Sequence, residues 1–330
     1  MADDRRNPTI HDVARAAGVS IGTVSKALNG TGSLAQSTRD RVMTTVRALN
    51  FRPNLLAKSL HTGLSGSVGL ISNDSFGRFT MPIMEGLERV LSEDGIGVFM
   101  ANATDDPERE LAHLEQLLAK QIDGLVVTSR RADRRPSIEI QGLPIPVIYV
   151  FSQGGEDALS FLPDDEGGAR LATEHLIQQG RTRIAHITGP DNFEAVRLRE
   201  IGWRAALTQA NLPPGPVLHG PWSEAWGREA MARLLTHPPD AIFCGNDQIA
   251  RGVADTIREA GLKCPEDIAL VGFDNWDVMV TACRPPLTSV DMNLTALGAE
   301  AGRQLAAMIK GAKPTGTHRL PCTLIHREST

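Results

Sequence analysis

The most informative segment of the sequence lies close to the N-terminus and reads Thr9-Ile-His-Asp-Val-Ala-Arg-Ala-Ala-Gly-Val-Ser-Ile-Gly-Thr-Val-Ser-Lys-Ala-Leu-Asn29. It predicts two short helices joined by a tight turn. Thr9 is a good N-cap for the first helix, and Asp12 stands three residues on, where a side chain can bond back to the cap. Gly18 supplies the permissive backbone that ends this helix. Ser20 is placed to cap the second helix. Two short helices with a glycine-containing turn form a helix-turn-helix.

A third helix is predicted farther along, capped by Ser37 or Thr38, with Val42, Val46 and Leu49 facing inward. In a helix-turn-helix unit, the second helix fits the major groove of DNA and its first turn meets the base edges. Short polar side chains on its outer face can reach phosphates. Any three-helix bundle shows the same apolar periodicity, so periodicity by itself leaves DNA binding open.

Two segments near the N-terminus carry a resemblance to a known family. Residues 12–29 resemble the headpiece signature D-V-A-x-x-A-G-V-S-x-x-T-V-S-[KR]-x-L-N of the lactose/galactose repressors, and residues 50–60, NFRPNLLAKSL, resemble the hinge of that family. The resemblance implies that the hinge folds into a short helix on DNA and inserts Leu60 into the minor groove, where an apolar wedge bends the duplex. The predicted DNA-binding residues are Thr9, Ser20, Ile21, Gly22, Thr23, Ser25, Lys26, Asn29, Thr38, Phe51, Asn54, Ala57 and Leu60.

Gly22 departs from the pattern of the family. Many members carry a bulky polar residue at the second position of the recognition helix, whereas Gly22 has no side chain with which to bond a base. We therefore expect base preference to come from Ile21 against a thymine methyl group, from Lys26, or from DNA shape.

The charge of the chain is distributed unevenly. The net charge is −5, yet residues 1–63 hold nine Lys and Arg against four Asp, and the remainder holds 25 Lys and Arg against 35 Asp and Glu. A basic head attracts DNA and an acidic body repels it, so binding is expected through one end.

The composition, 41% hydrophobic and 22% charged over 330 residues, is that of an ordinary globular protein with two or three folding units. The sequence contains no run of about 18 apolar residues and no apolar signal core, which predicts a cytoplasmic protein without a membrane segment. Its cysteines form no C-x-x-C pair and have no histidine at zinc-ligand spacing, so we expect reduced thiols and no metal site. They are Cys244, Cys264, Cys283 and Cys322.

From about residue 67 the pattern changes to short apolar runs separated by amphipathic stretches. The apolar runs lie at 68–71, 96–100, 125–127, 147–151, 184–187, 242–244 and 268–273. The amphipathic stretches lie at 81–94, 106–118, 166–179, 195–210, 223–236 and 247–260. Strands that alternate with helices predict parallel α/β sheets, and seven runs fit two doubly wound lobes better than one.

This region is similar to the two-lobed periplasmic-binding-protein-like core that follows such headpieces in the family. The similar segments are residues 164–176, 245–248, 271–274 and 285–290. The expected fold is thus α/β, with a small all-α helix-turn-helix headpiece and a two-lobed, doubly wound core. The predicted boundaries are 1–52 for the headpiece, 53–66 for a hinge helix and linker, 67–163 plus 291–321 for the N-terminal lobe, and 164–290 plus 322–330 for the C-terminal lobe.

Ligands of open parallel sheets bind beyond the carboxyl ends of the strands. The residues that follow the predicted strands are 73–76, 151–152, 192–199, 246–247 and 274–276. The effector-contacting positions of the family map onto Arg199, Trp222, Asn246 and Asp274. The predicted effector-binding residues are Asp74, Phe76, Phe151, Arg199, Trp222, Asn246 and Asp274.

The residue types in this set favour a sugar or sugar derivative. Guanidinium, amide and carboxylate groups can exchange hydrogen bonds with vicinal hydroxyls, and an indole offers a flat face to a sugar ring. A purine stays as an alternative, because bases stack on aromatic rings as well. Asn246 and Asp274 could instead cap the helices that follow them, and Trp222 could belong to the core.

Other classes of protein fit less well. The sequence lacks G-x-S-x-G, P-loop and H-E-x-x-H motifs, and its G-x-G-x-x-A match at residues 30–35 lies between headpiece helices rather than after a strand. We therefore predict a transcriptional regulator that represses, not an enzyme, and no cofactor. A soluble, secreted sugar-binding protein would carry no basic headpiece. No leucine heptad follows residue 311, so we expect a dimer rather than a tetramer. The expected partners are operator DNA, a small effector and one further copy of the chain.

Overall fold

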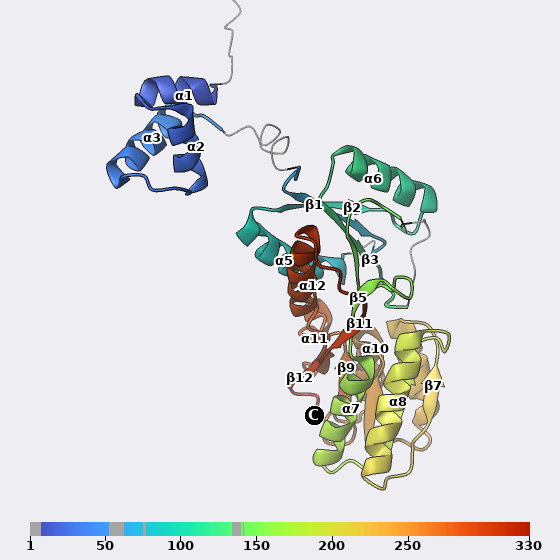
Figure 1. Cartoon of the computed structure of the whole chain (residues 1–330). Helices are drawn as coiled ribbons and strands as arrows, with labels where there is room; N and C mark the ends of the chain where they lie inside the picture. The colour runs from blue at the N-terminus through green and yellow to red at the C-terminus, as the bar shows by residue number, and fades with distance from the viewer. Residues whose placement is uncertain (1–7, 53–62, 75–76, 134–139, 141) are drawn as a thin grey trace, which may run out of the picture. The chain divides into compact units, whose positions relative to one another are not determined.

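The structure, a computed structural model, describes residues 8–52, 63–74, 77–133, 140 and 142–330. The chain divides into two compact units, residues 1–65 and 66–330. The first unit, the headpiece, contains α1 (Ile10–Ala17), α2 (Ile21–Asn29) and α3 (Gln36–Ala48), drawn in blue in Figure 1.

The caps predicted for the first two headpiece helices are confirmed. Thr9 and Asp12 form a reciprocal capping box, Gly18 ends α1 at φ +64°, and the Ser20 hydroxyl accepts a hydrogen bond from the Thr23 amide. The cap predicted for the third helix is wrong. That helix begins at Gln36 and is capped at Ala35, two or three residues before the predicted caps, so Ser37 and Thr38 lie inside its first turn and the cap position makes no side-chain bond. The three helices bury one small core, made of Val13, Ala14, Ala17, Val24, Ala27, Val42 and Phe51.

The second unit, the core, contains two six-stranded sheets. The first sheet has the order β11-β5-β4-β3-β1-β2, and all its neighbouring strands are parallel. Its strands are β1 (Ser67–Ser72), β2 (Gly97–Asn102), β3 (Gly124–Thr128), β4 (Val147–Val150), β5 (Leu159–Pro163) and β11 (Gly316–Leu320). Helices α5 (Thr80–Leu91), which ends in the 3-10 turn Ser92–Asp94, and α12 (Leu294–Ile309) pack on one face. Helix α6 (Pro107–Ala119) packs on the other.

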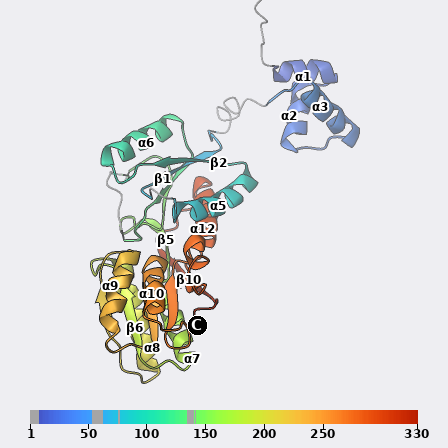
Figure 2. The same cartoon turned by 180° about the vertical axis from the view of Figure 1, so that it is seen from behind.

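The second sheet has the order β12-β10-β9-β8-β6-β7 and is parallel except at β12. Its strands are β6 (Ile184–Thr188), β7 (Val217–His219), β8 (Ala241–Cys244), β9 (Ala269–Phe273), β10 (Thr288–Asp291) and β12 (Thr323–Ile325). The helix pair α7 (Asp165–Gln178) and α8 (Glu194–Gln209) covers one face, and α9 (Glu224–Leu234) with α10 (Asp247–Glu259) covers the other, as Figures 1 and 2 show. A short helix, α11 (Asp277–Val280), follows β9.

The predicted fold class is confirmed, and each of the seven predicted strand regions contains a strand. Helix α12 and the strands β5, β7, β10, β11 and β12 were not predicted from the sequence. Three connections run between the sheets, after β5, β10 and β11. The lobe boundaries stay a prediction, which the sheet membership of these strands supports.

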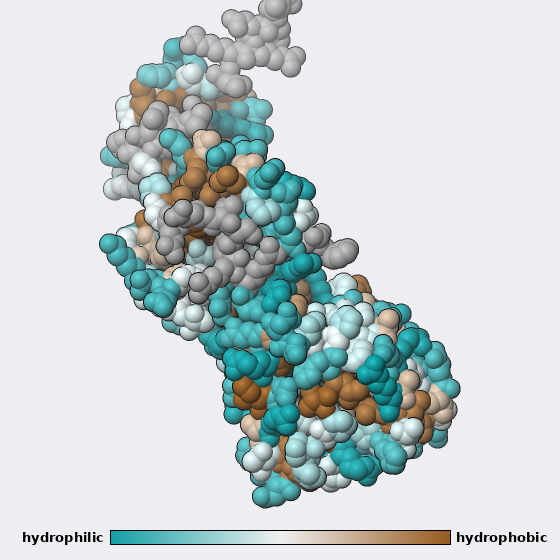
Figure 3. Space-filling model, turned by 90° about the vertical axis from the view of Figure 1, so that its right-hand side faces the viewer, coloured by the Kyte–Doolittle hydropathy of each residue, from teal (hydrophilic) through white to brown (hydrophobic). Residues whose placement is uncertain are grey.

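The helices of the described residues are too short or too polar for a membrane span, and none of them is long and apolar enough to cross a bilayer. On the face drawn in Figure 3, hydrophobic residues form separate patches between hydrophilic ones.

Candidate effector cleft and DNA-binding headpiece

The outer face of α2 presents the predicted base-reading side chains to solvent. Ile21 is 42% exposed, which is unusual for so large an apolar side chain, and Gly22 and Lys26 are exposed beside it. An exposed isoleucine next to a lysine suits contact with a thymine methyl group and a phosphate or guanine. The structure therefore leaves these side chains unburied, as a major-groove interface requires.

Other predicted DNA-binding residues have structural partners within the headpiece. Thr9 and Ser20 hold helix caps, and the Asn29 amide nitrogen lies 3.3 Å from the Ser25 hydroxyl. Phe51 is only 9% exposed and packs in the headpiece core, so its ring supports the fold rather than presenting a free surface. Thr23 and Thr38 are half-buried. Asn54, Ala57 and Leu60 lie outside the described residues.

A cavity of about 600 Å³ lies in the core, between side chains from the two sheets and their helices. This volume is typical of a small-molecule site. Six of the seven predicted effector-binding residues line it, namely Asp74, Phe151, Arg199, Trp222, Asn246 and Asp274. Phe76 lies outside the described residues. Among the residues that the structure describes, no cluster of His, Cys, Asp and Glu could hold a metal ion.

Arg199, on α8, is buried and largely engaged by groups of its own lobe. Its Nε lies 2.8 Å and its Nη2 2.7 Å from a carboxylate oxygen of Asp165, and its Nη1 donates to the Gly245 carbonyl. The guanidinium also lies 3.6 Å from the centre of the Phe273 ring. Burial raises the pKa of Asp165, and the charge of Arg199 acts against that rise. Both residues line the cavity, and the hydrogen-bond donors of Arg199 already have partners within the lobe.

The capping alternative holds for Asn246, because its side-chain oxygen accepts a hydrogen bond of 2.9 Å from the Ile249 amide at the start of α10. Trp222 packs partly against the apolar core of its lobe and meets Phe193 edge to face, with ring centres 5.9 Å apart. Both residues nevertheless keep part of their surface on the cavity.

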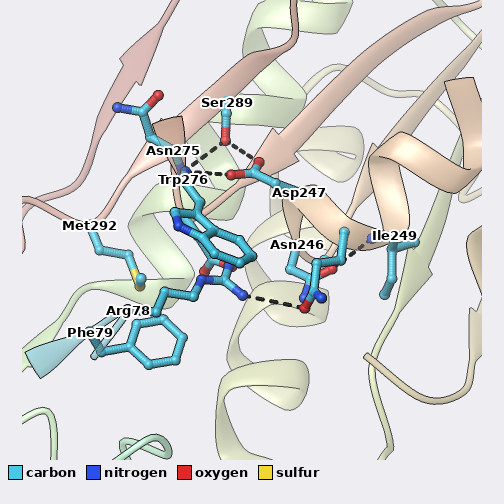
Figure 4. A network of polar contacts seen from close by, with 12 residues as sticks. Arg78, Phe79, Asn246, Asp247, Ile249, Asn275, Trp276, Ser289 and Met292 are labelled. Atoms are coloured by element: carbon cyan, nitrogen blue, oxygen red, sulfur yellow. Dashed lines mark hydrogen bonds and ion pairs between the residues drawn. The ribbon is translucent and has the colours of Figure 1, made fainter. Parts of the chain in front are cut away.

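Arg78 reaches across the cavity from the first lobe, just before α5. Its guanidinium forms an ion pair with Asp274, which follows β9, and its Nη1 lies 3.4 Å from the Gln248 side-chain oxygen on α10. The side chain lies against the rings of Phe79 and Trp276, 4.9 and 4.5 Å from their centres (Figure 4). Burial raises the pKa of Asp274, and the charge of Arg78 opposes that rise most strongly.

A second bridge joins the lobes at the N-terminus of α8. Asp133 of the first lobe accepts a hydrogen bond from the Glu194 amide, and the Arg131 guanidinium lies 3.6 Å from the centre of the Phe193 ring. Burial acts to raise the pKa of Asp133, but the hydrogen bonds from Arg131 and from the Glu194 amide bring it below its ordinary value. Asp133 is therefore a charged carboxylate, held by its neighbours at the edge of the cavity.

The backbone of the cavity wall is strained at three points. Phe151, Asp274 and Asn275 adopt φ values of +53°, +102° and +49°, a region that residues other than glycine rarely visit. Such conformations cost about 1–3 kcal/mol each and concentrate at ligand sites. Two of these residues, Phe151 and Asp274, line the cavity directly.

Part of the cavity lining was not predicted from the sequence. The residues outside the predicted positions are Arg78, Phe79, Arg130, Arg131, Ala132, Asp133, Asp165 and Gln248. Arg78 and Phe79 directly precede α5, and extending the search from each strand end to the first helical turn would have found both. Arg131 and Asp133 follow β3, whose carboxyl end was not included among the candidate positions.

Comparison with known proteins agrees with this arrangement. Residues 9–54 match the family model of bacterial regulatory proteins of the lacI family, and residues 173–330 match that of the periplasmic binding protein-like domain. The ribose operon repressor of Escherichia coli K12 is 36% identical over 297 residues, which cover 88% of this chain and 89% of that protein. The chain belongs to the lacI family. It is a DNA-binding transcriptional regulator.

Further relatives of this lacI-family regulator include a second repressor and two solved structures with a bound small molecule. The transcriptional repressor PurR of Haemophilus influenzae is 34% identical, over 89% of this chain and 88% of its own. A solved lac repressor dimer bound to operator and the anti-inducer ONPF has a TM-score of 0.77 at 27% identity, covering 98% of this chain and 99% of that one. A CelR–cellobiose complex has a TM-score of 0.68 at 30% identity, covering 98% and 100%.

Proposed function

We propose that this regulator acts as a homodimeric repressor in the cytoplasm, binds an inverted-repeat operator, and is controlled by a sugar or sugar derivative in the cavity between its lobes. The observation that carries the effector part is the lining of that cavity, where buried carboxylate, amide and guanidinium groups stand beside aromatic faces. A two-fold dimer presents two headpieces, which matches an inverted repeat. The ribose repressor and CelR–cellobiose relatives are consistent with a sugar.

The proposed DNA-binding residues are those predicted from the sequence, with Ile21 and Lys26 setting base preference and Leu60 as the minor-groove wedge. The exposure of Ile21 and Lys26 on α2 supports the first part. The proposed effector-binding residues are likewise the predicted set, extended by Trp276 and Gln248.

A purine is the second candidate effector. The rings of Phe79 and Trp276 both lie against the planar guanidinium of Arg78. A planar base could stack on the same two rings. The similarity to a PurR repressor is consistent with this alternative.

One experiment tests both halves of the proposal. DNA is selected from a random pool by the full chain, and gel shifts on the selected site are repeated with a panel of sugars and purines. We expect an inverted repeat, and at least one sugar that changes the operator affinity. Selection of a single asymmetric half-site would contradict the dimer, and a panel in which only purines act would replace the sugar.

The variant Asp274→Ala locates the site. Losing hydrogen bonds to a buried charged group costs about 1.5–3 kcal/mol, so the affinity for the active compound should fall by roughly 10- to 100-fold while operator binding without it persists. Glu229→Ala, which removes an exposed carboxylate on α9 of the same lobe, is the matched control and should leave the affinity unchanged. Equal affinity in parent and Asp274→Ala would remove the cavity from the proposal.

A further inference from the structure

The Arg78–Asp274 contact joins two lobes through the middle of the candidate effector cavity. The two residues are 196 positions apart in the chain, and both line the cavity. Arg78 keeps only 12% of its side-chain surface exposed, and Asp274 only 6%. The guanidinium therefore occupies volume and hydrogen-bonding capacity that a ligand of this cavity would otherwise use.

Asp274 depends on Arg78 for its closest positive charge. The other nearby cation, Arg199, lies 3.9 Å from a carboxylate oxygen of Asp274, but it approaches Asp165 to 2.7 Å and also donates to the Gly245 carbonyl. A buried carboxylate without a partner is strongly destabilising, so Asp274 favours a cation or a group rich in hydrogen-bond donors opposite it. In this structure Arg78 fills that role.

The fit of Arg78 in the slot is incomplete. Its Nη atoms bond Asp274 and Gln248, and its planar group lies against Phe79 and Trp276, yet its Nε is buried without a hydrogen-bond partner among the described residues (Figure 4). A buried donor left unpaired is destabilising, because it loses its hydrogen bond to water without gaining another. The slot thus holds the arginine firmly but not optimally, as expected of an occupant that can be exchanged.

We propose that Arg78 is a built-in occupant of the effector cavity, which holds Asp274 and Gln248 of the opposite lobe and must withdraw when an effector takes its place between Phe79 and Trp276. An effector then competes with Arg78 and has to present a flat face to the two rings and several donors to Asp274. Arg78 thereby sets both the affinity threshold and the ligand class. This inference rests on the proposed effector role of the cavity.

The test uses ethylguanidinium, which is the part of the arginine side chain that Arg78→Ala removes beyond Cβ. Titration calorimetry compares its binding to the parent, to Arg78→Ala and to Arg130→Ala, all as full-length chains. We expect Arg78→Ala to bind it at least about tenfold more tightly than the parent, because the slot and its carboxylate stand vacant. Ethylammonium, which carries the same charge without the planar group, should bind more weakly.

Arg130→Ala is the matched control. Arg130 also lines the cavity and pairs with an aspartate, but its partner Asp105 belongs to the same lobe, 2.8 Å away, and its side chain is 57% exposed. Its removal should create no ethylguanidinium site. Equal binding to Arg78→Ala, Arg130→Ala and the parent would overturn the proposal.

A double variant and a refolding measurement complete the test. The double variant Arg78→Ala/Asp274→Asn has no carboxylate left without its arginine, so it should fold. It should bind ethylguanidinium no better than the parent does. If Arg78→Ala itself is unfolded, ethylguanidinium should restore its fold, and failure to do so beside a folded double variant would show a permanent structural ion pair and refute the proposal. None of these titrations involves DNA or a sugar, so they can succeed or fail independently of the proposed repressor function.

Discussion

Asp247, at the start of α10, is a carboxyl group that the fold removes almost entirely from water. Its two oxygens accept hydrogen bonds of 2.6 Å from the Ser289 hydroxyl and 2.7 Å from the Trp276 amide (Figure 4). Burial, and then the charge of nearby Asp274, raise the pKa of Asp247 to about 8. The native protein therefore holds a proton there that the unfolded chain, with a pKa of about 3.9, releases at neutral pH.

This difference gives stability a pH dependence with a definite sign. A group whose pKa is raised on folding contributes stability that is complete below the unfolded pKa and is lost as the pH rises through the folded pKa, so the loss runs from about pH 4 to about pH 8. Asp247→Asn copies the protonated acid and should flatten that slope by about one proton. Urea unfolding of the core at mildly acidic and mildly alkaline pH measures it.

The control for this prediction lies on the same helix. Asp255→Asn alters a carboxylate of α10 that forms an ion pair with Arg228 near the surface, and it should keep the slope of the parent. A slope in Asp247→Asn as steep as in the parent would assign the pH dependence to other groups.

At the scale of elements, the first lobe depends on the close crossing of α5 and α12. Gly298 and Gly302 lie one turn apart on α12 and face α5. A Cβ at Gly298 would stand 2.1 Å from the Ile83 carbonyl oxygen, a backbone atom that cannot move aside, whereas a Cβ at Gly302 would stand 3.4 Å from the Leu87 carbonyl oxygen. The helices can therefore approach at Gly298 only without a side chain.

We expect Gly298→Ala to destabilise the core by about 1–3 kcal/mol, the usual cost of overpacking. Gly302→Ala meets ordinary contact and gains up to about 1 kcal/mol of helix propensity, so it should be close to neutral. Chemical unfolding of the two variants beside the parent compares them directly. Equal destabilisation by both would mean that the crossing adjusts its spacing as a whole.

At the scale of the whole molecule, charge separates the two units. The first 63 residues carry an excess of five positive charges, and the chain as a whole carries −5. Lysine and arginine contacts with phosphates release counterions, so operator affinity should fall at least about tenfold between roughly 50 and 200 mM salt. Gel shifts across a salt series measure this, and a flat response would contradict binding through the basic headpiece.

Two lysine variants test which of the two units gives rise to the salt dependence of operator affinity. Lys26→Ala removes an exposed positive charge of α2 and should lower the slope of log affinity against log salt by about one. Lys120→Ala removes an exposed lysine that follows α6 in the core and should leave the slope unaltered. The opposite result would place the DNA contacts on the acidic unit.

The sequence by itself determined the headpiece and the class of the core. Helix caps, glycine helix ends and apolar periodicity are interactions between residues a few positions apart, so local spacing alone indicates the roles of Thr9, Gly18 and Ser20. The alternation of apolar runs and amphipathic stretches likewise predicts a parallel α/β core, and the rule on strand ends located Asp74 and Asp274 at the cavity. The third-helix cap was wrong because Ala35, the residue at the cap, has no side chain that can bond the helix, so local spacing favoured the hydroxyls of Ser37 and Thr38 instead.

Only the tertiary structure decided which charges face one another. Arg78 and Asp274 meet after 196 positions, and β11 joins the first sheet beside β5 after all strands of the second sheet except β12 have been traversed. Such pairings depend on strand order and on the approach of α5 to α12, which no local pattern encodes. The Arg78–Asp274 contact in the cavity is therefore a property of the folded core, because a charge that folding buries needs a partner, wherever in the chain that partner lies.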